Sequence, residues 1–171
     1  MKPLAPRSNI ISRRALLAAG GAVAFAPGAA LAQGGARIEW PALRMLDGST
    51  LRAAEFNDTA ALVVFWATHC PFCKRHNVHV DKLHRTLGRR ALRVLGVALD
   101  SDAQLVRDYM RSNGYGFPVA LDGEGLRQRL GLRRVIPATL PIGRDGRMGK
   151  AVYGEMFEED LMEIASGLAA A

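Results

Sequence analysis

Two cysteines are the residues of this 171-residue chain whose type and spacing most clearly permit chemistry. Cys70 and Cys73 enclose Pro71 and Phe72 in a Cys-x-x-Cys motif, and the chain contains no other cysteine. Such a pair can cycle between dithiol and disulfide, or supply half of a zinc site. A structural zinc site would need a second ligand pair, and a structural disulfide closing so short a loop would constrain the unfolded chain little. The motif therefore predicts redox activity.

The residues around the motif predict a buried strand that runs into a helix. Residues 61–66 are a continuous apolar run, as expected for a central strand covered on both faces. Residues 71–87 carry a stripe of inward side chains at helical spacing, and Gly88 is the expected stop. Cys70 then lies at the helix N-terminus, where backbone N–H groups favour a thiolate. Cys73 lies one turn later, shielded and placed to attack a mixed disulfide formed at Cys70.

The rest of the sequence alternates strand and helix patterns, which predicts an α/β domain. Ser101 is expected to open a capping box, and Leu105 and Phe157 are expected to face the core. The expected elements are a hairpin around Asp47-Gly48, strands over 92–99 and 117–121, a helix after Ser101, a brief helix over 126–130, a terminal hairpin of 138–142 and 148–152, and a last helix.

Taken together, these motifs resemble the thioredoxin-fold thiol–disulfide oxidoreductases, and within them the exported TlpA-like and ResA-like group associated with cytochrome c maturation. The resemblance covers about residues 38–168 and implies a thioredoxin-like fold: a central mixed sheet flanked by helices, with an added N-terminal β-hairpin. It rests on the Asp47-Gly48 hairpin, the run from Phe65 to Lys74, the strand that ends at Asp100 before a capped helix, and Val135 to Thr139 followed by Asp145-Gly146.

The resemblance also implies a second segment of the site. In the family, the proline that matches Pro137 is cis and faces the two cysteines, and the preceding residue, here Ile136, pairs its backbone with the substrate. We expect Ile136, Trp66 and Phe72 to contribute to substrate binding, with Trp66 packed behind the motif. Pro141 falls inside the strand expected after Pro137. Because a strand tolerates a missing N–H only at an edge or a bulge, Pro141 is expected to disturb the pairing of that strand.

Three positions depart from the family pattern. His69 replaces a common tryptophan, and is either an imidazolium that favours the Cys70 thiolate or a solvated loop histidine. Val64 stands where thioredoxins often bury a carboxylate. His76 stands where many relatives carry glutamate, and is either a proton acceptor for Cys73 or a satisfied helix histidine.

Residues 1–32 are expected to be an export signal. They hold basic but no acidic residues, followed by a small, apolar run over 15–26 that is short for a membrane span. Arg13-Arg14 resembles the twin-arginine signal, and Ala30-Leu31-Ala32 predicts cleavage before Gln33, with an uncleaved anchor as the alternative. The thioredoxin-like domain would be residues 33–171, placed in the periplasm.

The charge of the chain is concentrated in that segment. The formal net charge is +7, and removing residues 1–32 takes away four basic side chains and leaves +3. The other basic residues are dispersed among acidic ones without an aromatic platform, which argues against a nucleic-acid partner. With 49% hydrophobic and 23% charged residues, the chain belongs to the globular class rather than the disordered or collagenous classes.

From these observations we expect a periplasmic, monomeric enzyme that reduces disulfides of exported proteins, with a membrane thiol reductase as electron donor. It would need no cofactor beyond its own Cys70–Cys73 disulfide, and no metal. One alternative is an oxidase of the same fold that inserts disulfides. Another is a copper-binding or copper-delivery protein, because a cluster of soft ligands surrounds the motif: His69, Cys70, Cys73, His76 and His79.

Overall fold

The computed structural model describes residues 35–87 and 92–170. The export signal expected at residues 1–32, its cleavage before Gln33 and the helix stop expected at Gly88 lie outside the described residues. Within the described ranges, no helix combines the length and the apolar character needed to cross a membrane.

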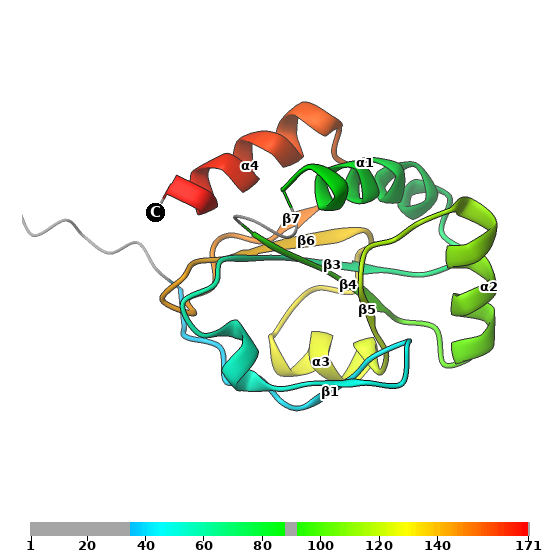
Figure 1. The fold of residues 1–171 in the computed structure, drawn as a ribbon, viewed down its shortest axis with the longest axis horizontal. Helices are drawn as coiled ribbons and strands as arrows, with labels where there is room; N and C mark the ends of the chain where they lie inside the picture. The colour runs from blue at the N-terminus through cyan, green and yellow to red at the C-terminus, as the bar shows by residue number, and fades with distance from the viewer. Residues whose placement is uncertain (1–34, 88–91, 171) are drawn as a thin grey trace, which may run out of the picture. The chain divides into compact units, whose positions relative to one another are not determined.

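A five-stranded mixed sheet forms the centre of the domain, as predicted (Figure 1). The strand order is β5-β4-β3-β6-β7, in which β3, β4 and β5 run parallel, β6 is antiparallel to β3, and β7 is antiparallel to β6. The strands are β3 (Ala61–Trp66), β4 (Arg93–Ala98), β5 (Val119–Ala120), β6 (Ala138–Ile142) and β7 (Val152–Tyr153).

Strand β3 is buried on both faces, as its continuous apolar run predicts. Leu62, Val64 and Trp66 enter one core cluster, while alternate residues such as Val63 and Phe65 enter the other. The first cluster lies under α1 (Pro71–Leu87), α2 (Ala103–Asn113) and α4 (Glu158–Ala170), and the second under α3 (Gly123–Arg129) and the N-terminal hairpin. Figure 1 shows α1 and α4 on one side of the sheet and α3 with β1 on the other.

The predicted N-terminal hairpin is present as a separate two-stranded sheet. Strands β1 (Leu43–Arg44) and β2 (Thr50–Leu51) pair antiparallel, and a short 3-10 helix, η1 (Ala53–Phe56), follows. At the turn Gly48 has φ 88°, a left-handed conformation that glycine adopts without strain. The Asp47 carboxylate accepts hydrogen bonds from the backbone N–H and the hydroxyl of Ser49.

The start of helix α2 differs from the sequence prediction. Asp102, rather than Ser101, is the N-cap, because its carboxylate accepts the backbone N–H groups of Gln104 and Leu105. This placement turns Leu105 to the surface and Val106 into the core.

Several predicted boundaries are also wrong. Phe157 lies exposed just before α4 rather than on its inward stripe. Strand β5 is shorter than the predicted 117–121, and α3 begins earlier than the predicted 126–130. In the terminal hairpin, Met148 makes an isolated bridge to Ile142 and β7 begins later, at Val152.

Pro141 is accommodated inside β6 without loss of pairing to β3. It lies opposite Leu62 of β3, and its carbonyl accepts a hydrogen bond from the Gly149 N–H at 2.8 Å. Because the N–H and C=O of a strand residue point to the same side, the missing N–H of Pro141 faces Gly149 rather than β3. β7 pairs with β6 only at Ala138 and Thr139, so no strand pairs with Pro141 on the side away from β3. A proline is tolerated at such an edge position.

Candidate active site

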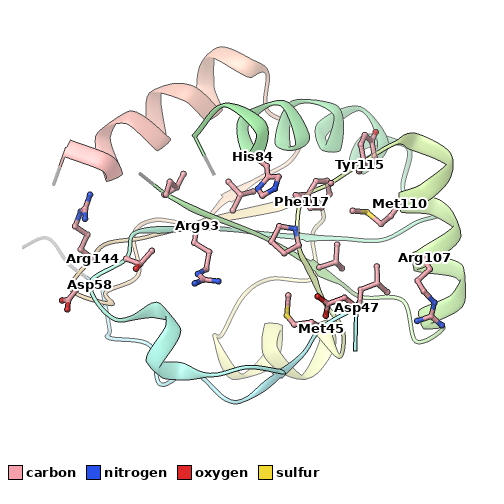
Figure 2. A pocket seen from close by; sticks show the side chains of 17 residues that line it. Met45, Asp47, Asp58, His84, Arg93, Arg107, Met110, Tyr115, Phe117 and Arg144 are labelled. Carbon is pink, nitrogen blue, oxygen red and sulfur yellow. The ribbon is translucent and has the colours of Figure 1, made fainter. Parts of the chain in front are cut away.

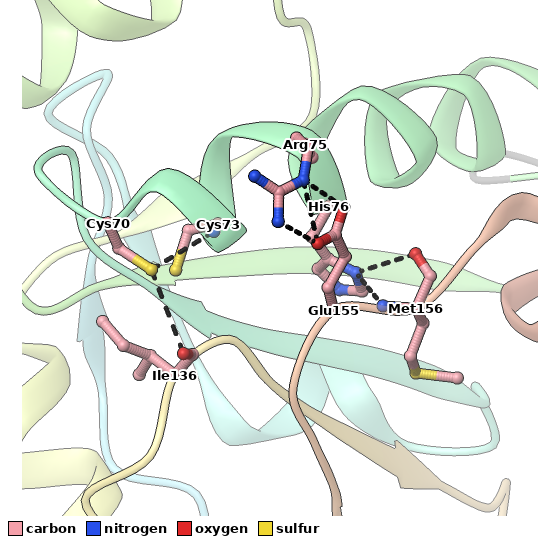
Figure 3. A network of polar contacts seen from close by, with 7 residues as sticks. All are labelled: Cys70, Cys73, Arg75, His76, Ile136, Glu155 and Met156. Atoms are coloured by element: carbon pink, nitrogen blue, oxygen red, sulfur yellow. Dashed lines mark hydrogen bonds and ion pairs between the residues drawn. The ribbon is translucent and has the colours of Figure 1, made fainter.

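The two cysteines lie at the start of α1, just after the loop that follows β3, as predicted. Cys70 directly precedes α1 and is 8% exposed, whereas Cys73, one turn into the helix, is 0% exposed. Both are free thiols, and the backbone N–H of Cys73 donates to the Cys70 Sγ at 3.2 Å (Figure 3). The Cys70 sulfur therefore receives a helix N-terminal hydrogen bond and is the more accessible of the two.

Cys73 is set apart from Cys70 by its surroundings. Burial raises the pKa of the Cys73 thiol well above its usual range, and its hydrogen bond with the Cys70 side chain raises it further. Cys73 is therefore a protonated, shielded thiol in the reduced protein. This asymmetry fits an order of reaction in which Cys70 attacks first and Cys73 attacks second.

The loop before β6 brings a third element to the motif. The Ile136–Pro137 peptide bond is cis, in agreement with the expectation from the resemblance. The Ile136 carbonyl oxygen lies 3.9 Å from the Cys70 Sγ (Figure 3). Pro137 is buried, Ile136 is half-buried and the preceding Val135 is exposed, so this loop forms one wall beside Cys70.

Trp66 and Phe72 occupy opposite sides of the motif. Trp66 is completely buried, and its ring packs against Tyr109 at 5.1 Å and Phe117 at 6.3 Å. The expectation that Trp66 binds substrate is therefore wrong, because the side chain has no surface to offer and supports the motif from behind. Phe72 is 54% exposed beside Cys70, and the Arg75 guanidinium lies 5.0 Å from its ring centre.

His76 is a buried histidine with both ring nitrogens engaged. Nδ1 lies 3.1 Å from the Met156 backbone nitrogen and 3.3 Å from its carbonyl oxygen, and Nε2 lies 3.2 Å from the Thr139 hydroxyl oxygen. Burial lowers the pKa of His76 to about 4, so the ring is a weak base that binds a proton poorly near pH 7. This weak basicity argues against His76 as proton acceptor for Cys73. The His76 side chain ties α1 to β6 and to the segment before α4.

His69 has the character of a solvated loop histidine. Its side chain is 82% exposed, and its Nδ1 lies 3.9 Å from the Asp100 carboxylate. That carboxylate is itself nearly buried and accepts the backbone N–H and the hydroxyl of Thr68 at 3.0 and 2.7 Å. Within residues 35–87 and 92–170, no hydrogen bond or ion pair joins His69 to Cys70, so the structure does not support its catalytic role.

Two contacts of the site could not be found from the sequence. Arg75 donates to Glu155 at 2.7 and 2.9 Å (Figure 3), and this ion pair lowers the pKa of Glu155. Thr68 anchors the loop before Cys70 to Asp100 at the end of β4. Both pairs join residues far apart in the chain, and the sequence carries no local signal for either.

The soft ligands around the motif do not gather into a metal site. The described ranges contain no group of three or more His, Cys, Asp or Glu side chains placed to hold a metal ion. Both ring nitrogens of His76 are already engaged, Nδ1 by the Met156 backbone and Nε2 by the Thr139 hydroxyl.

A cavity of about 880 Å³ lies away from the cysteines (Figure 2). Its lining includes Met45, His84, Arg93 and Phe117, but neither cysteine nor Ile136. This cavity is therefore separate from the two cysteines and from the loop before β6 that lies beside them.

Comparisons with known proteins agree with this geometry. The Redoxin family matches residues 33–166. The chain is 27% identical over 126 residues to the thiol-disulfide oxidoreductase ResA of Halalkalibacterium halodurans, which covers 71% of each protein. It is 26% identical over 114 residues to ResA of Bacillus subtilis, covering 66% of this chain and 63% of that one.

Solved structures show the same fold. StoA from Bacillus subtilis superposes with a TM-score of 0.64 at 22% identity, over 72% of this chain and 94% of StoA. A thioredoxin family protein from Chlorobium tepidum, described as a thiol:disulfide interchange protein, gives 0.67 at 22% identity, over 78% and 99% of the two chains. These likenesses confirm the predicted thioredoxin-like fold.

Proposed function

The chain belongs to the Redoxin family and is a thiol-disulfide oxidoreductase of ResA type, and from this we propose that it reduces the disulfides of exported proteins through Cys70 and Cys73. The observation that carries the proposal is the asymmetric dithiol: Cys70 lies beside Ile136 with 8% of its surface exposed, and Cys73 is completely buried. No bound cofactor is needed in this scheme, because the two thiols supply both electrons.

The reaction proceeds in two exchanges. The Cys70 thiolate attacks one sulfur of a substrate disulfide, the substrate S–S bond breaks, and the other substrate sulfur leaves as a thiol. Cys73 then attacks the Cys70 sulfur of the mixed disulfide, which forms the Cys70–Cys73 disulfide and releases the second substrate thiol. Two electrons pass from the enzyme to the substrate, and a donor dithiol must return them.

The surface beside Cys70 supports binding of an extended substrate segment. Ile136 is half-buried next to the Cys70 sulfur, where its backbone can pair with a substrate strand. Phe72 and Val135 are exposed apolar side chains on the two elements that flank the sulfur. The substrate in this proposal is a protein disulfide in an exposed, extended segment.

The cellular setting rests on the sequence. Residues 1–32 with Arg13-Arg14 support export to the periplasm, and the ResA-like resemblance supports a role in cytochrome c maturation. A membrane thiol reductase would be the electron donor, and the enzyme would act as a monomer. Cell fractionation tests the location: the full chain should reach the periplasm, and replacing Arg13 and Arg14 by lysine should hold it in the cytoplasm.

One observation favours the opposite direction of catalysis. The Cys73 N–H stabilises the Cys70 sulfur of the reduced protein, and stabilising the reduced form makes a disulfide more oxidising. Equilibration with a glutathione buffer separates the two functions. A potential of about −250 mV or below supports the reductase, and one of about −120 mV supports an oxidase that inserts disulfides.

Insulin reduction tests the activity itself. The protein should turn over insulin in the presence of a dithiol donor, and Cys70→Ser should abolish turnover. Tight Cu(I) binding without any insulin reduction would instead favour the copper-delivery alternative.

A further inference from the structure

Cys73 must lose its proton to complete the reaction, and the side chains at the positions where relatives carry an acceptor are unsuitable. Val64 offers no carboxylate, and His76 is a weak base with a pKa of about 4 and both ring nitrogens engaged. The thiolate of a buried cysteine is costly unless hydrogen bonds stabilise it. Polar side chains of the described core with unused hydrogen-bonding capacity are therefore the candidates to stabilise it.

Asn77 and Tyr109 have that capacity. Asn77 is 0% exposed, and neither its Nδ2 nor its Oδ1 has a hydrogen-bond partner among the described residues. The hydroxyl of Tyr109 is also buried and meets no hydrogen-bond geometry with a described residue, although it is near enough to the Asn77 side chain to interact with it. Buried polar atoms are nearly always paired in folded proteins, so three orphaned atoms from two neighbouring side chains call for a functional explanation.

Both side chains lie in the core on the same side of the sheet as the resolving cysteine. Asn77 follows Cys73 by four residues, so the two share the buried face of α1 one turn apart. Tyr109 comes from α2, and its ring packs 5.1 Å from Trp66, directly behind the motif. The Tyr109 hydroxyl interacts with the Asn77 side chain and electrostatically with both cysteine sulfurs.

The chemistry of the two groups fits a thiolate. The Asn77 amide carries two N–H donors, and the Tyr109 hydroxyl carries one. Burial raises the pKa of Tyr109 to about 12, so its hydroxyl keeps its proton under ordinary conditions. Hydrogen bonds to an ionised acceptor are roughly twice as strong as neutral ones, so these donors favour the thiolate over the thiol.

We propose that Asn77 and Tyr109 donate hydrogen bonds to the Cys73 sulfur as it becomes a thiolate, and thereby drive the second exchange. This inference deepens the proposed function and rests on it. The step balances: the Cys73–Cys70 bond forms, the bond from Cys70 to the substrate sulfur breaks, and the Cys73 proton ends on the released substrate thiol. In this step Cys73 is oxidised, the substrate sulfur is reduced, and Cys70 stays at the disulfide level.

Besides the Ala67 backbone, whose hydrogen bond lowers the pKa of Cys73, the other groups near this thiol are weak bases or are engaged elsewhere. On α1 itself, His76 is a weak base and Cys70 is held in the mixed disulfide during this step. After α2, the Tyr115 hydroxyl donates to the Lys74 carbonyl. At the end of β4, Asp100 is engaged by Thr68. The strands behind the motif present Trp66 and Thr139, which do not ionise.

Stopped-flow reaction of the reduced full chain with Ellman's reagent separates the two exchanges. The first release of thionitrobenzoate reports attack by Cys70, and the second reports resolution by Cys73. In Tyr109→Phe and in Asn77→Leu, the second phase should slow about tenfold at pH 7, and its pH midpoint should rise by about one unit. The first phase should keep its wild-type rate.

Tyr115→Phe is the matched control, because it removes a hydroxyl from a neighbouring tyrosine of the same aromatic cluster. The ring centres of Tyr115 and Tyr109 are 6.1 Å apart. This change should leave both phases unchanged. Tyr109→Phe keeps the ring packing, so it decides the matter if Asn77→Leu does not fold. Wild-type midpoints in the folded variants would overturn the inference. A wild-type protein that reacts in two phases but does not reduce insulin would overturn the proposed function instead.

Discussion

The carbonyl oxygen of Ile136 lies 3.9 Å from the Sγ of Cys70, although 66 residues separate them in the chain. Strand order explains the meeting, because β6 lies directly beside β3, so the loop before β6 and the end of β3 share one edge of the sheet. The Cys70 sulfur therefore lies next to a backbone carbonyl of the loop before β6. In the proposed reaction, substrate binding and attack take place at this junction.

Alkylation should distinguish the two cysteines. At pH 7, iodoacetamide should modify Cys70 of the reduced native protein much faster than Cys73, because Cys73 is fully buried and burial raises its pKa. Peptide mass spectrometry after a short exposure measures the two rates. Denaturing the protein in urea should bring the rates together, and equal labelling of both in the native state would contradict the described burial.

His76 should stabilise the protein rather than tune its reactivity. His76→Leu leaves the Met156 N–H and the Thr139 hydroxyl without their partner, so unfolding should require about 2–4 kcal/mol less free energy. The pH profile of the Cys73 step should stay unchanged. A large shift of that profile with little loss of stability would restore His76 as proton acceptor.

The same histidine makes the fold acid-sensitive. Its pKa is about 4 in the folded protein against 6.5 for a free histidine, so between these values the unfolded chain binds the extra proton. This contribution to stability is complete above pH 6.5 and is lost as the pH falls to 4. Urea titrations across this window should show a decline in wild type that His76→Gln reduces, and an equal decline in both would contradict the assignment.

Phe72 should contribute to binding of protein substrates. Phe72→Ala should lower kcat/KM for insulin about fivefold, equivalent to about 1 kcal/mol of apolar contact, while the reaction with Ellman's reagent keeps its rate. The control is Val78→Ala, which removes an apolar side chain of similar exposure from the same helix. Equal effects of both changes would show that general surface hydrophobicity, rather than Phe72, is responsible.

Packing behind the motif should tolerate no added volume. A Cβ at Gly96 would lie 2.7 Å from the Phe117 ring and 3.0 Å from the Trp66 indole nitrogen, so Gly96→Ala should destabilise the fold by about 1–3 kcal/mol. Gly125, inside α3, has open space around it, so Gly125→Ala should instead be neutral or stabilise by about 0.5–1 kcal/mol. Thermal unfolding measures both changes, and similar effects would contradict the packing described.

The parts of the fold that follow from local sequence could be predicted. A continuous apolar run defined β3, and the position of the motif after it placed Cys70 at the start of α1. The cis Ile136–Pro137 bond followed from the resemblance to a known family. Asp102 was missed as N-cap because Ser101 beside it is an equally good capping residue by type.

The parts of the site that depend on distant contacts could not be predicted. The inward position of His76 was visible in the helical stripe, but its partners Thr139 and Met156 lie 63 and 80 residues away. The apolar run indicated that Trp66 lies in a buried strand, but it did not show that the ring is completely covered by Tyr109, Phe117 and the rest of the core. Asn77 did leave a signal, since a polar residue on the buried face of a helix needs a partner.

The central claim is that Cys70 attacks substrate disulfides and Cys73 resolves the product. The most direct measurement incubates Cys73→Ser and Cys70→Ser with an oxidised protein substrate and identifies the adducts by mass spectrometry. The account predicts a stable mixed disulfide through Cys70 in Cys73→Ser, and no adduct in Cys70→Ser. An adduct through Cys73 in Cys70→Ser, with none in Cys73→Ser, would contradict it.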